Sequence, residues 1–297
     1  MGIRINPNPL TDLLPGLALD QKQADQAIQE LSTGKKVSQP SDDPAAVAGL
    51  IVNNAQTSRV NAYLSNISIL QGSLQEADST LNSVVTSLTQ AISLGTEGAN
   101  GTLNQTDRNA LVQEVNGVQQ QLLDYANQSF EGNYLFAGTA VNTAPFVSDS
   151  SSTSGVSYVG NSGVNSIEIG DGQTVPANLP GNQLFTASGS DVFQALRDLS
   201  SALASGSNVP AAETEVQNAF NYISARRSFY GTTLDRLNTA TSFLNQENTQ
   251  LTQEQNSLVG ADMATAASQL SQAETALDAA MAAGGKISQT SLLNYLT

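Results

Sequence analysis

Residues 60–91 read VNAYLSNISILQGSLQEADSTLNSVVTSLTQA, and their apolar side chains recur alternately every third and every fourth position. Ser, Asn, Gln, Thr and Glu fill most of the positions between them. The apolar series is Val60, Tyr63, Ile67, Leu70, Leu74, Ala77, Leu81, Val84, Leu88 and Ala91. This heptad pattern is typical of a helix that packs along its whole length against a partner helix. A helix from about Pro44 to Gly98 would be roughly 80 Å long, which indicates a rod element.

A second helix is expected to begin near Thr106 and Asp107, whose side chains can cap it, and to end at Gly132. A third should follow Ser190, an N-cap for the run from residue 192 to residue 204.

The last helical block runs from Pro210 to the C-terminus and again carries heptads. Its apolar positions, seven residues apart, are Tyr230, Leu237, Leu244, Leu251 and Leu258. The companion positions Thr241, Asn248 and Gln255 are polar. Because a half-polar seam is weak by itself, we expect a partner helix or hydrated contacts along it.

Between these helical blocks the composition shifts to Gly, Ser, Thr and Asn. Short alternating runs at residues 156–159 and 166–169 are followed by the tight-turn sequence Gly170-Asp171-Gly172. Such runs are typical of strands joined by turns. We therefore predict a mainly α fold, an elongated antiparallel helical bundle or coiled coil formed by both chain ends, with a small β-rich inserted domain. The predicted division is residues 1–43 and 262–297 for terminal assembly helices, 44–138 and 190–261 for a helical rod, and 139–189 for the insertion.

Both chain ends carry narrow apolar stripes of their own. The stripes are Leu17, Ala24, Ile28 and Leu31 at one end, and Met263, Ala266, Leu270, Ala273, Leu277 and Ala280 at the other. A single amphipathic helix cannot bury its own stripe, so each stripe needs the other one or a neighbouring copy. The predicted assembly interface comprises Leu17, Ile28, Leu31, Met263, Leu270, Leu277, Leu292, Leu293 and Tyr295.

The connector LSTGKKVSQPSDDPA at residues 31–45 reads as a helix end followed by a helix start. Gly34 is predicted to adopt the left-handed conformation of a C-cap, while Lys35 and Lys36 complement the carbonyl end of the helix dipole. Asp43 is predicted to cap the next helix and Pro44 to occupy its first turn.

Two other interpretations of this connector, as a carboxylate site or as an enzyme active site, are less well supported than helix capping. Asp42 and Asp43 could form a carboxylate pair for acid–base work or for a hard cation, but no other acidic residue lies close in sequence. Ser32 and Lys35 fit the S-x-x-K pattern of penicillin-interacting Ser enzymes, but the accompanying K-T-G and S-D-N motifs are missing.

Composition argues against catalysis and against several classes of partner. The 297 residues include no Cys and no His, which removes most groups for thiol chemistry, soft-metal binding and acid–base work near neutral pH. No nucleotide-binding or hydrolase motif is present, so no cofactor is expected. The formal charge of −15 argues against nucleic acid and against an anionic membrane surface. Pro7, Pro9, Asp12 and Pro15 interrupt the apolar run that a signal peptide would need, and no transmembrane span is expected.

The main cationic cluster is Arg226, Arg227 and Arg236. These residues could be solvated helix surface, or they could pair with acids such as Asp235 on the same helix. In an acidic chain that assembles, scarce cations are equally good candidates for intersubunit ion pairs.

Residues 31–45 resemble the N-terminal signature of bacterial flagellins and flagellin-like proteins. This chain also resembles the C-terminal region of that family, at Arg227-x-x-x-Gly231, at Arg236-Leu237 and at the DMAT sequence of residues 262–265. Within the family, GNYLFAGT at residues 132–139 resembles the G-x-Y-L-F-x-G stretch of hook–filament junction proteins. Residues 169–185 resemble the middle region of those proteins, and the C-terminus lacks the Leu-Leu-Arg close common in flagellins.

The resemblance implies a structural subunit, not an enzyme, that joins the hook of the bacterial flagellum to its filament. Copies of the chain would form a ring, with the neighbouring hook-associated protein and flagellin as partners. A cytoplasmic export chaperone would cover the C-terminal helix before type III export to the cell exterior without a cleaved signal. The terminal helices would order on assembly. The alternatives are a flagellin, or a secreted coiled-coil adhesin that binds its ligand through residues 139–189.

Overall fold

The computed structural model describes the backbone of residues 9–295 and the side chains of residues 13–286. The chain forms two compact units. We call residues 1–59 and 247–297 the terminal unit, and residues 60–246 the central unit. The two longest helices, α2 (Pro44–Gly98) and α6 (Val209–Val259), contribute to both units.

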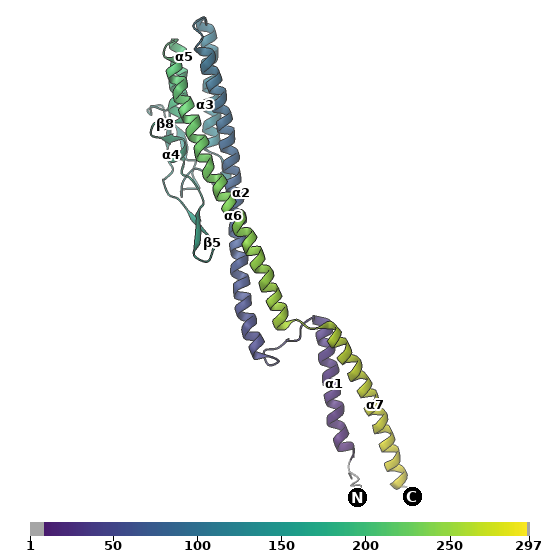
Figure 1. The fold of residues 1–297 in the computed structure, drawn as a ribbon. Helices are drawn as coiled ribbons and strands as arrows, with labels where there is room; N and C mark the ends of the chain where they lie inside the picture. Colours follow the sequence, from purple (N-terminus) through teal and green to yellow (C-terminus); the bar gives the residue numbers. More distant parts are fainter. Residues whose placement is uncertain (1–8, 296–297) are drawn as a thin grey trace. The chain divides into compact units, whose positions relative to one another are not determined.

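The terminal unit pairs helices from opposite ends of the chain. Helix α1 (Pro9–Thr33) packs against α7 (Met263–Tyr295), and the two run antiparallel, so that the start of α1 and the end of α7 lie at the same end of the pair (Figure 1). The buried side chains along this contact are small: Ala24, Ala27, Ala266 and Ala273. Alanine lets two helix backbones approach closely, but it buries little apolar surface.

A backbone joint links the ends of α1 and α6 in the terminal unit. Gly34 adopts a φ of +69° and donates its N–H to the carbonyl of Glu30 at 2.8 Å, which ends α1. The Ala261 N–H then donates to the Gly34 carbonyl at 2.9 Å, and the Lys36 N–H to the Val259 carbonyl at 2.9 Å. Val37 packs with Ala46 and Val259 in a small apolar cluster beside this joint.

A buried amide lies where the first turns of α2 meet the last turns of α6. Asn53 is 2% exposed, and its Nδ2 donates to the Leu251 carbonyl at 3.0 Å and to Glu254 Oε2 at 3.3 Å. Its Oδ1 is buried without a hydrogen-bond partner. Asn53 precedes Val60 by one heptad, so it occupies a seam position.

The central unit is built on the heptad face of α2. Every residue of the predicted series is buried except Tyr63, which is half-buried, and α2 has the predicted bounds. Helix α6 lies alongside α2 in this unit (Figure 1), and Gln71 Nε2 donates to Asn238 Oδ1 at 2.9 Å between them. Along α6 the predicted positions Tyr230, Leu237 and Leu244 are buried.

Two shorter helices, α3 (Gln105–Ala126) and α5 (Val192–Ser205), pack against each other in the central unit. Their ends differ from the prediction. Asn104 caps α3, with Asp107 as the reciprocal member of a capping box, and α3 ends at Ala126 rather than at Gly132. Asp191, not Ser190, caps α5, because its carboxylate accepts the Gln194 N–H at 2.9 Å.

The β-rich part of the central unit consists of antiparallel two-stranded sheets and one short helix. Its elements are β1 (Ser129–Phe130) with β2 (Asn133–Tyr134), β3 (Phe146–Ser148) with β4 (Val156–Tyr158), β5 (Ser166–Gly170) with β6 (Gln173–Pro176), α4 (Gly181–Leu184), and β7 (Thr186–Ala187) with β8 (Ser190–Asp191). Sheets of this size cannot bury a core alone. Phe136, Phe146 and Phe185 supply one together with Phe193 of α5, with ring centroids between 5.2 and 6.4 Å apart in the contacting pairs.

The prediction of a mainly α fold is confirmed, with long helices from both chain ends packed together and a small β-rich insertion. The proposed division into three domains stays a prediction. The compact units divide within α2 and α6, at residues 59/60 and 246/247, and not at helix ends.

Candidate assembly surfaces

The seam between α1 and α7 includes four of the nine predicted interface residues. Leu17, Leu31, Leu270 and Leu277 are half-buried. Two other predicted residues do not lie in the covered part of this seam, because Ile28 remains 51% exposed and Met263 remains 48% exposed. Ala27 and Ala266 are buried instead. The side chains of Leu292, Leu293 and Tyr295 lie outside the described residues.

Incomplete burial is the main property of this seam. Its leucines keep part of their surface in solvent, while the residues that are fully covered are alanines. Leu14, Leu19 and Ile28 add further exposed apolar surface to α1, at 63%, 56% and 51%. Apolar surface of this extent along a helix pair is typical of a site where another protein packs.

The connector carboxylates bind backbone N–H groups. Asp43 Oδ1 accepts the N–H groups of Ala45 and Ala46, each at 3.0 Å, which is the geometry of an N-cap, and Pro44 is the first residue of α2. Asp42 Oδ2 accepts the N–H groups of Ser38 and Gln39 at 3.0 and 2.8 Å. Across the side chains of residues 13–286, no group of three or more carboxylates is arranged to hold a metal ion.

The three arginines of the predicted cationic cluster differ in their contacts. Arg227 forms a two-point ion pair with Asp78 of α2, at 2.9 Å from Nε and 3.1 Å from the terminal nitrogen, so an intersubunit pair would have to displace Asp78. Arg226 stacks on the Tyr222 ring, with its guanidinium carbon 4.9 Å from the ring centroid. Arg236 is exposed and makes no hydrogen bond or ion pair with the described part of the chain.

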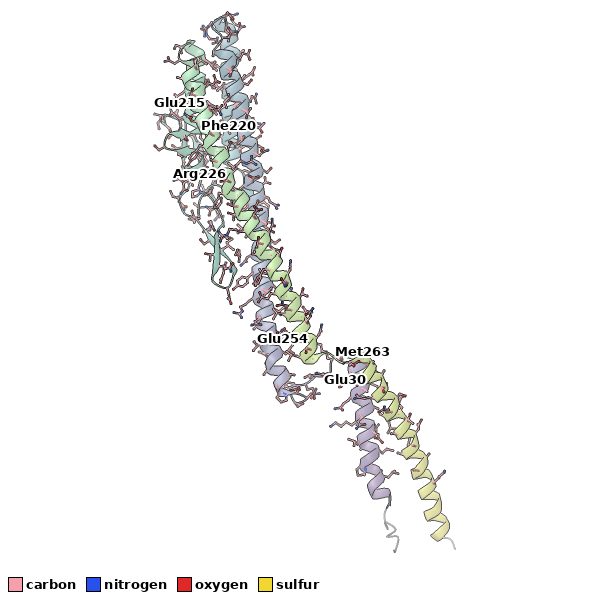
Figure 2. All side chains as sticks on the ribbon, viewed as in Figure 1. Glu30, Glu215, Phe220, Arg226, Glu254 and Met263 are labelled. Carbon is pink, nitrogen blue, oxygen red and sulfur yellow. The ribbon has the colours of Figure 1, made fainter. Side chains whose placement is uncertain are left out.

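Figure 2 shows where side chains from several of these elements lie on the ribbon, with Glu30 and Met263 at the joint of the terminal unit and Arg226 on α6.

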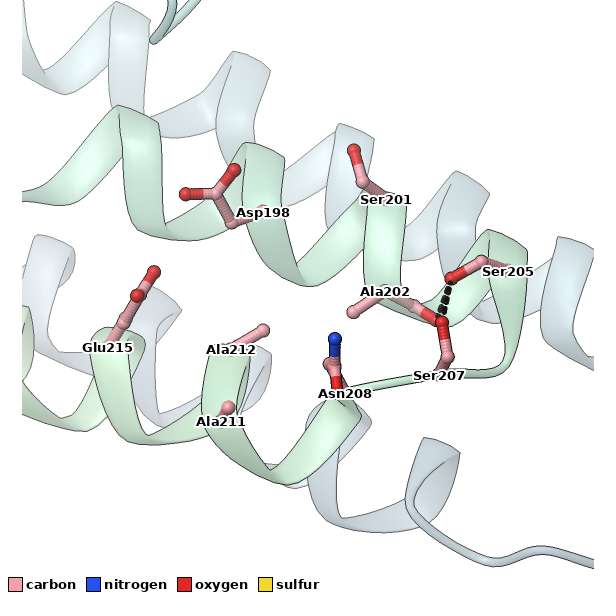
Figure 3. Close-up of a pocket in the computed structure, with 9 residues that line it drawn as sticks. All are labelled: Asp198, Ser201, Ala202, Ser205, Ser207, Asn208, Ala211, Ala212 and Glu215. Atoms are coloured by element: carbon pink, nitrogen blue, oxygen red, sulfur yellow. Dashed lines mark hydrogen bonds between the residues drawn. The ribbon is translucent and has the colours of Figure 1, made fainter.

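A polar groove lies where the end of α5 meets the start of α6 (Figure 3). It encloses about 370 Å³, and Asp198 and Glu215 face it from the two helices. Ser205 and Ser207 form a hydrogen bond of 2.9 Å at its other end, beside the left-handed Gly206 that ends α5. Since Asp198 already accepts a hydrogen bond from Gln194 at 2.8 Å, the groove offers one unengaged carboxylate and no cation.

A second groove of the central unit is apolar and encloses about 280 Å³. We call it the apolar groove. It lies between α2, the β1–β2 hairpin and β5, and its apolar lining residues are Ile69, Leu70, Phe130, Tyr134, Leu135, Val141, Ile167 and Ala177. Glu131 and Asn133 lie at the same groove. The walls of this groove come from segments that are far apart in the chain, so no local sequence pattern predicts it.

The shifted pKa values have structural causes. Hydrogen bonds from the Ser151 and Ser157 hydroxyls, both at 2.6 Å, lower the pKa of Asp149 to about 2. Hydrogen bonds from Thr265 and from the N–H of Ala264 lower the pKa of Asp262, which caps α7. Burial raises the pKa of Tyr230 and of Asp191. Each of these groups caps a helix, closes a turn or fills the core.

Paired terminal helices with a partly covered apolar seam, joined to a helical unit with a β-rich insertion, define a self-assembling helical subunit. Family models agree with this class: the bacterial flagellin N-terminal helical region matches residues 12–141, and the bacterial flagellin C-terminal helical region matches residues 214–296. The chain belongs to the bacterial flagellin family.

Similar proteins include a flagellar hook-associated protein and a flagellin. Flagellar hook-associated protein 3 of Escherichia coli K12 is 26% identical over 281 residues, which cover 84% of this chain and 86% of that protein. A flagellin of Listeria innocua is 25% identical over 248 residues, which cover 82% of this chain and 81% of that protein.

Solved structures show the same fold. A putative flagellar hook-associated protein from Vibrio parahaemolyticus has a TM-score of 0.68 at 22% identity, with 74% of this chain and 100% of that chain covered. FlgL from Xanthomonas campestris has a TM-score of 0.62 at 17% identity, with 67% and 98% covered. In the part of the chain that the structure describes, no helix has the length and apolar character needed to cross a membrane.

Proposed function

We propose that this chain is a structural subunit of the bacterial flagellum that joins the hook to the filament, assembles through its terminal helices and has no catalytic role. The observation that carries the proposal is the α1–α7 pair, whose leucines are only half-buried while Ile28 and Met263 stay exposed. A helix pair of this kind gains stability when neighbouring copies cover the remaining apolar surface.

The junction, rather than the filament, is favoured by the Escherichia coli hook-associated relative, whose match spans both chains almost throughout. The GNYLFAGT stretch at residues 132–139 supports the same choice. A flagellin is the second candidate, because the Listeria innocua flagellin covers nearly as much of the chain.

The proposed partners follow from this role. Copies of the chain form a ring between an adjoining hook-associated protein on one side and flagellin on the other. An export chaperone covers the C-terminal helix inside the cell, and the chain leaves without cleavage of a signal peptide. The proposed contacts between copies involve Leu17, Ile28, Leu31, Met263, Leu270 and Leu277.

Deletion of the gene tests the role. We expect the deletion strain to release unpolymerised flagellin into the medium, and labelled protein to appear in electron micrographs at the boundary between hook and filament in the complemented strain. Normal filaments in the deletion strain would overturn the proposal, and label along the whole filament would support the flagellin alternative.

A paired substitution tests the terminal seam. Leu270→Asp with Leu277→Asp places two charges on the half-buried face of α7, and we expect it to abolish incorporation into flagella while the central unit stays folded. The matched control is Ser268→Asp with Thr275→Asp, which has the same spacing on exposed positions of α7 and should incorporate normally. Incorporation of the leucine variant at the control level would contradict a seam-based assembly.

A further inference from the structure

The central unit carries one large aromatic side chain in solvent. Phe243 on α6 is 66% exposed, which is the highest value among the large hydrophobic side chains described. Arg236 lies one heptad before it, two helical turns or roughly 10 Å away on the same flank of α6. An exposed phenylalanine beside an unengaged arginine has the composition of an interface hot spot.

The apolar groove offers a complementary surface. Ile69 at its edge is 59% exposed, and Tyr134, Leu135 and Ile167 are half-buried, so a further apolar side chain could enter and be covered on several sides. None of the residues that line the groove belongs to α6. Phe243 and the groove are therefore separate surfaces of the chain.

The apolar groove also carries a charge that is complementary to Arg236. Glu131 borders the groove, is exposed, and makes no hydrogen bond or ion pair among the described side chains. The β1–β2 turn holds it there with a φ of +49°, a conformation that residues other than Gly, Asn and Asp seldom adopt. A carboxylate at the rim of an apolar groove is complementary to a phenylalanine with an arginine on the same helix flank.

We infer that Phe243 of one copy of this chain inserts into the apolar groove of a second copy, with Arg236 paired to Glu131 at the rim. The second copy in turn presents its own Phe243 to the groove of a third copy, so the contact is head-to-tail, and such contacts propagate into a ring or a helix instead of closing as a two-fold dimer. The inference rests on the proposed function, since it adds a second contact between copies to the one that the terminal helices make.

Charge exchange tests the inference in the full-length chain, expressed in a strain that lacks its own copy. Arg236→Glu and Glu131→Arg are each expected to lower the amount of protein in purified flagella by roughly tenfold, since each places like charges together. The double variant should recover most of the incorporation. Phe243→Ala should lower it by roughly tenfold, whereas Val159→Ala, which truncates a 50% exposed side chain outside the groove, should not. Thermal unfolding midpoints close to that of the unaltered chain would show that the variants fold.

Disulfide crosslinking gives a second measurement of the contact. Because the sequence contains no Cys, only the introduced thiols of this chain can form a disulfide between copies. Thr239→Cys places a thiol near Phe243, and Asn133→Cys places one at the groove. Oxidation of assembled flagella should give a ladder of multimers for the chain with both cysteines and no dimers for either single variant.

The outcomes separate the two proposals. Dimers from a single-cysteine chain, or a double charge variant no better than its parents, would overturn the head-to-tail contact. Normal incorporation of Phe243→Ala and of both single charge variants would overturn it as well, while the junction role would stand. Absence of the unaltered chain from flagella would overturn both.

Discussion

The heptad face of α2 in the central unit and the seam between α1 and α7 in the terminal unit use the same spacing of apolar residues with different results. Leu81, Val84 and Leu88 are fully buried, because α6 and the neighbouring elements of the central unit cover α2. Leu270 and Leu277 carry the same pattern and are half-buried against α1. Periodicity therefore specifies which face of a helix is apolar, and the number of neighbours decides how far that face is buried.

The largest expected effect comes from truncation at matched positions of the two regions. Leu81→Ala should lower the free energy of unfolding by about 2–5 kcal/mol, because it removes a fully buried side chain and leaves a cavity. Leu270→Ala should lower it by about 1 kcal/mol or less, since part of that side chain is already in solvent. Denaturant unfolding of the monomer, followed by circular dichroism, measures both changes.

The comparison would fail if the two truncations destabilised the monomer equally. Equal losses would mean that the terminal seam is as complete in the isolated chain as the central one.

A smaller effect is expected from the ion pair that ties α6 to α2 in the central unit. Arg227→Ala should lower the free energy of unfolding by about 1 kcal/mol, because Asp78 loses a two-point partner at a partly exposed site. Arg226→Ala is the adjacent control, and we expect a smaller change, since Arg226 is exposed and makes its stacking contact and its 2.8 Å hydrogen bond with Tyr222 of the same helix. A loss from Arg226→Ala that matches the loss from Arg227→Ala would show that the ion pair does not contribute.

The smallest expected effect depends on pH and is confined to the β3–β4 turn. The pKa of Asp149 is lowered from 3.8 to about 2, so its hydrogen bonds stabilise the folded chain above pH 3.8, and this contribution is lost as the pH falls toward 2. Asp149→Asn should therefore be less stable than the unaltered chain at pH 6, and the difference should be much smaller at pH 2, where the folded-state carboxyl is about half protonated. Unfolding midpoints at the two pH values test this, and a difference as large at pH 2 as at pH 6 would contradict it.

Sequence reasoning located α2 well, because its apolar series is long, regular and bounded by Pro44 and Gly98. It located the N-terminal seam less well. Both Ala27 and Ile28 fit a spacing of three or four from Ala24, and hydrophobicity favours Ile28. The structure buries Ala27, because only a small side chain fits where two backbones approach closely.

Helix starts could have been assigned more closely from the sequence. Asn104 and Asp107 form the N-x-x-D spacing of a capping box, and Asp191 stands directly before the apolar run of α5. The apolar groove could not be predicted, since Ile69, Tyr134 and Ile167 come together only through tertiary packing. The exposure of Phe243 could have been predicted, because this phenylalanine stands among the polar residues of α6, one position before the seam residue Leu244.

Asn53 bears on how two long repetitive helices find their alignment. Leu237, Leu244 and Leu251 recur every seven residues, so an apolar seam alone would tolerate a shift of α6 by one heptad at little cost. In the native alignment the Asn53 Nδ2 reaches the Leu251 carbonyl and Glu254. A shift that brings Leu258 to the place of Leu251 would put Ala261 in the place of Glu254, and the buried amide would lose its carboxylate partner. The opposite shift would offer Leu244 and Glu247 at the same spacing, so Asn53 discriminates against sliding in one direction only. One polar side chain thus makes the energy of misalignment depend on the direction in which the two helices slide.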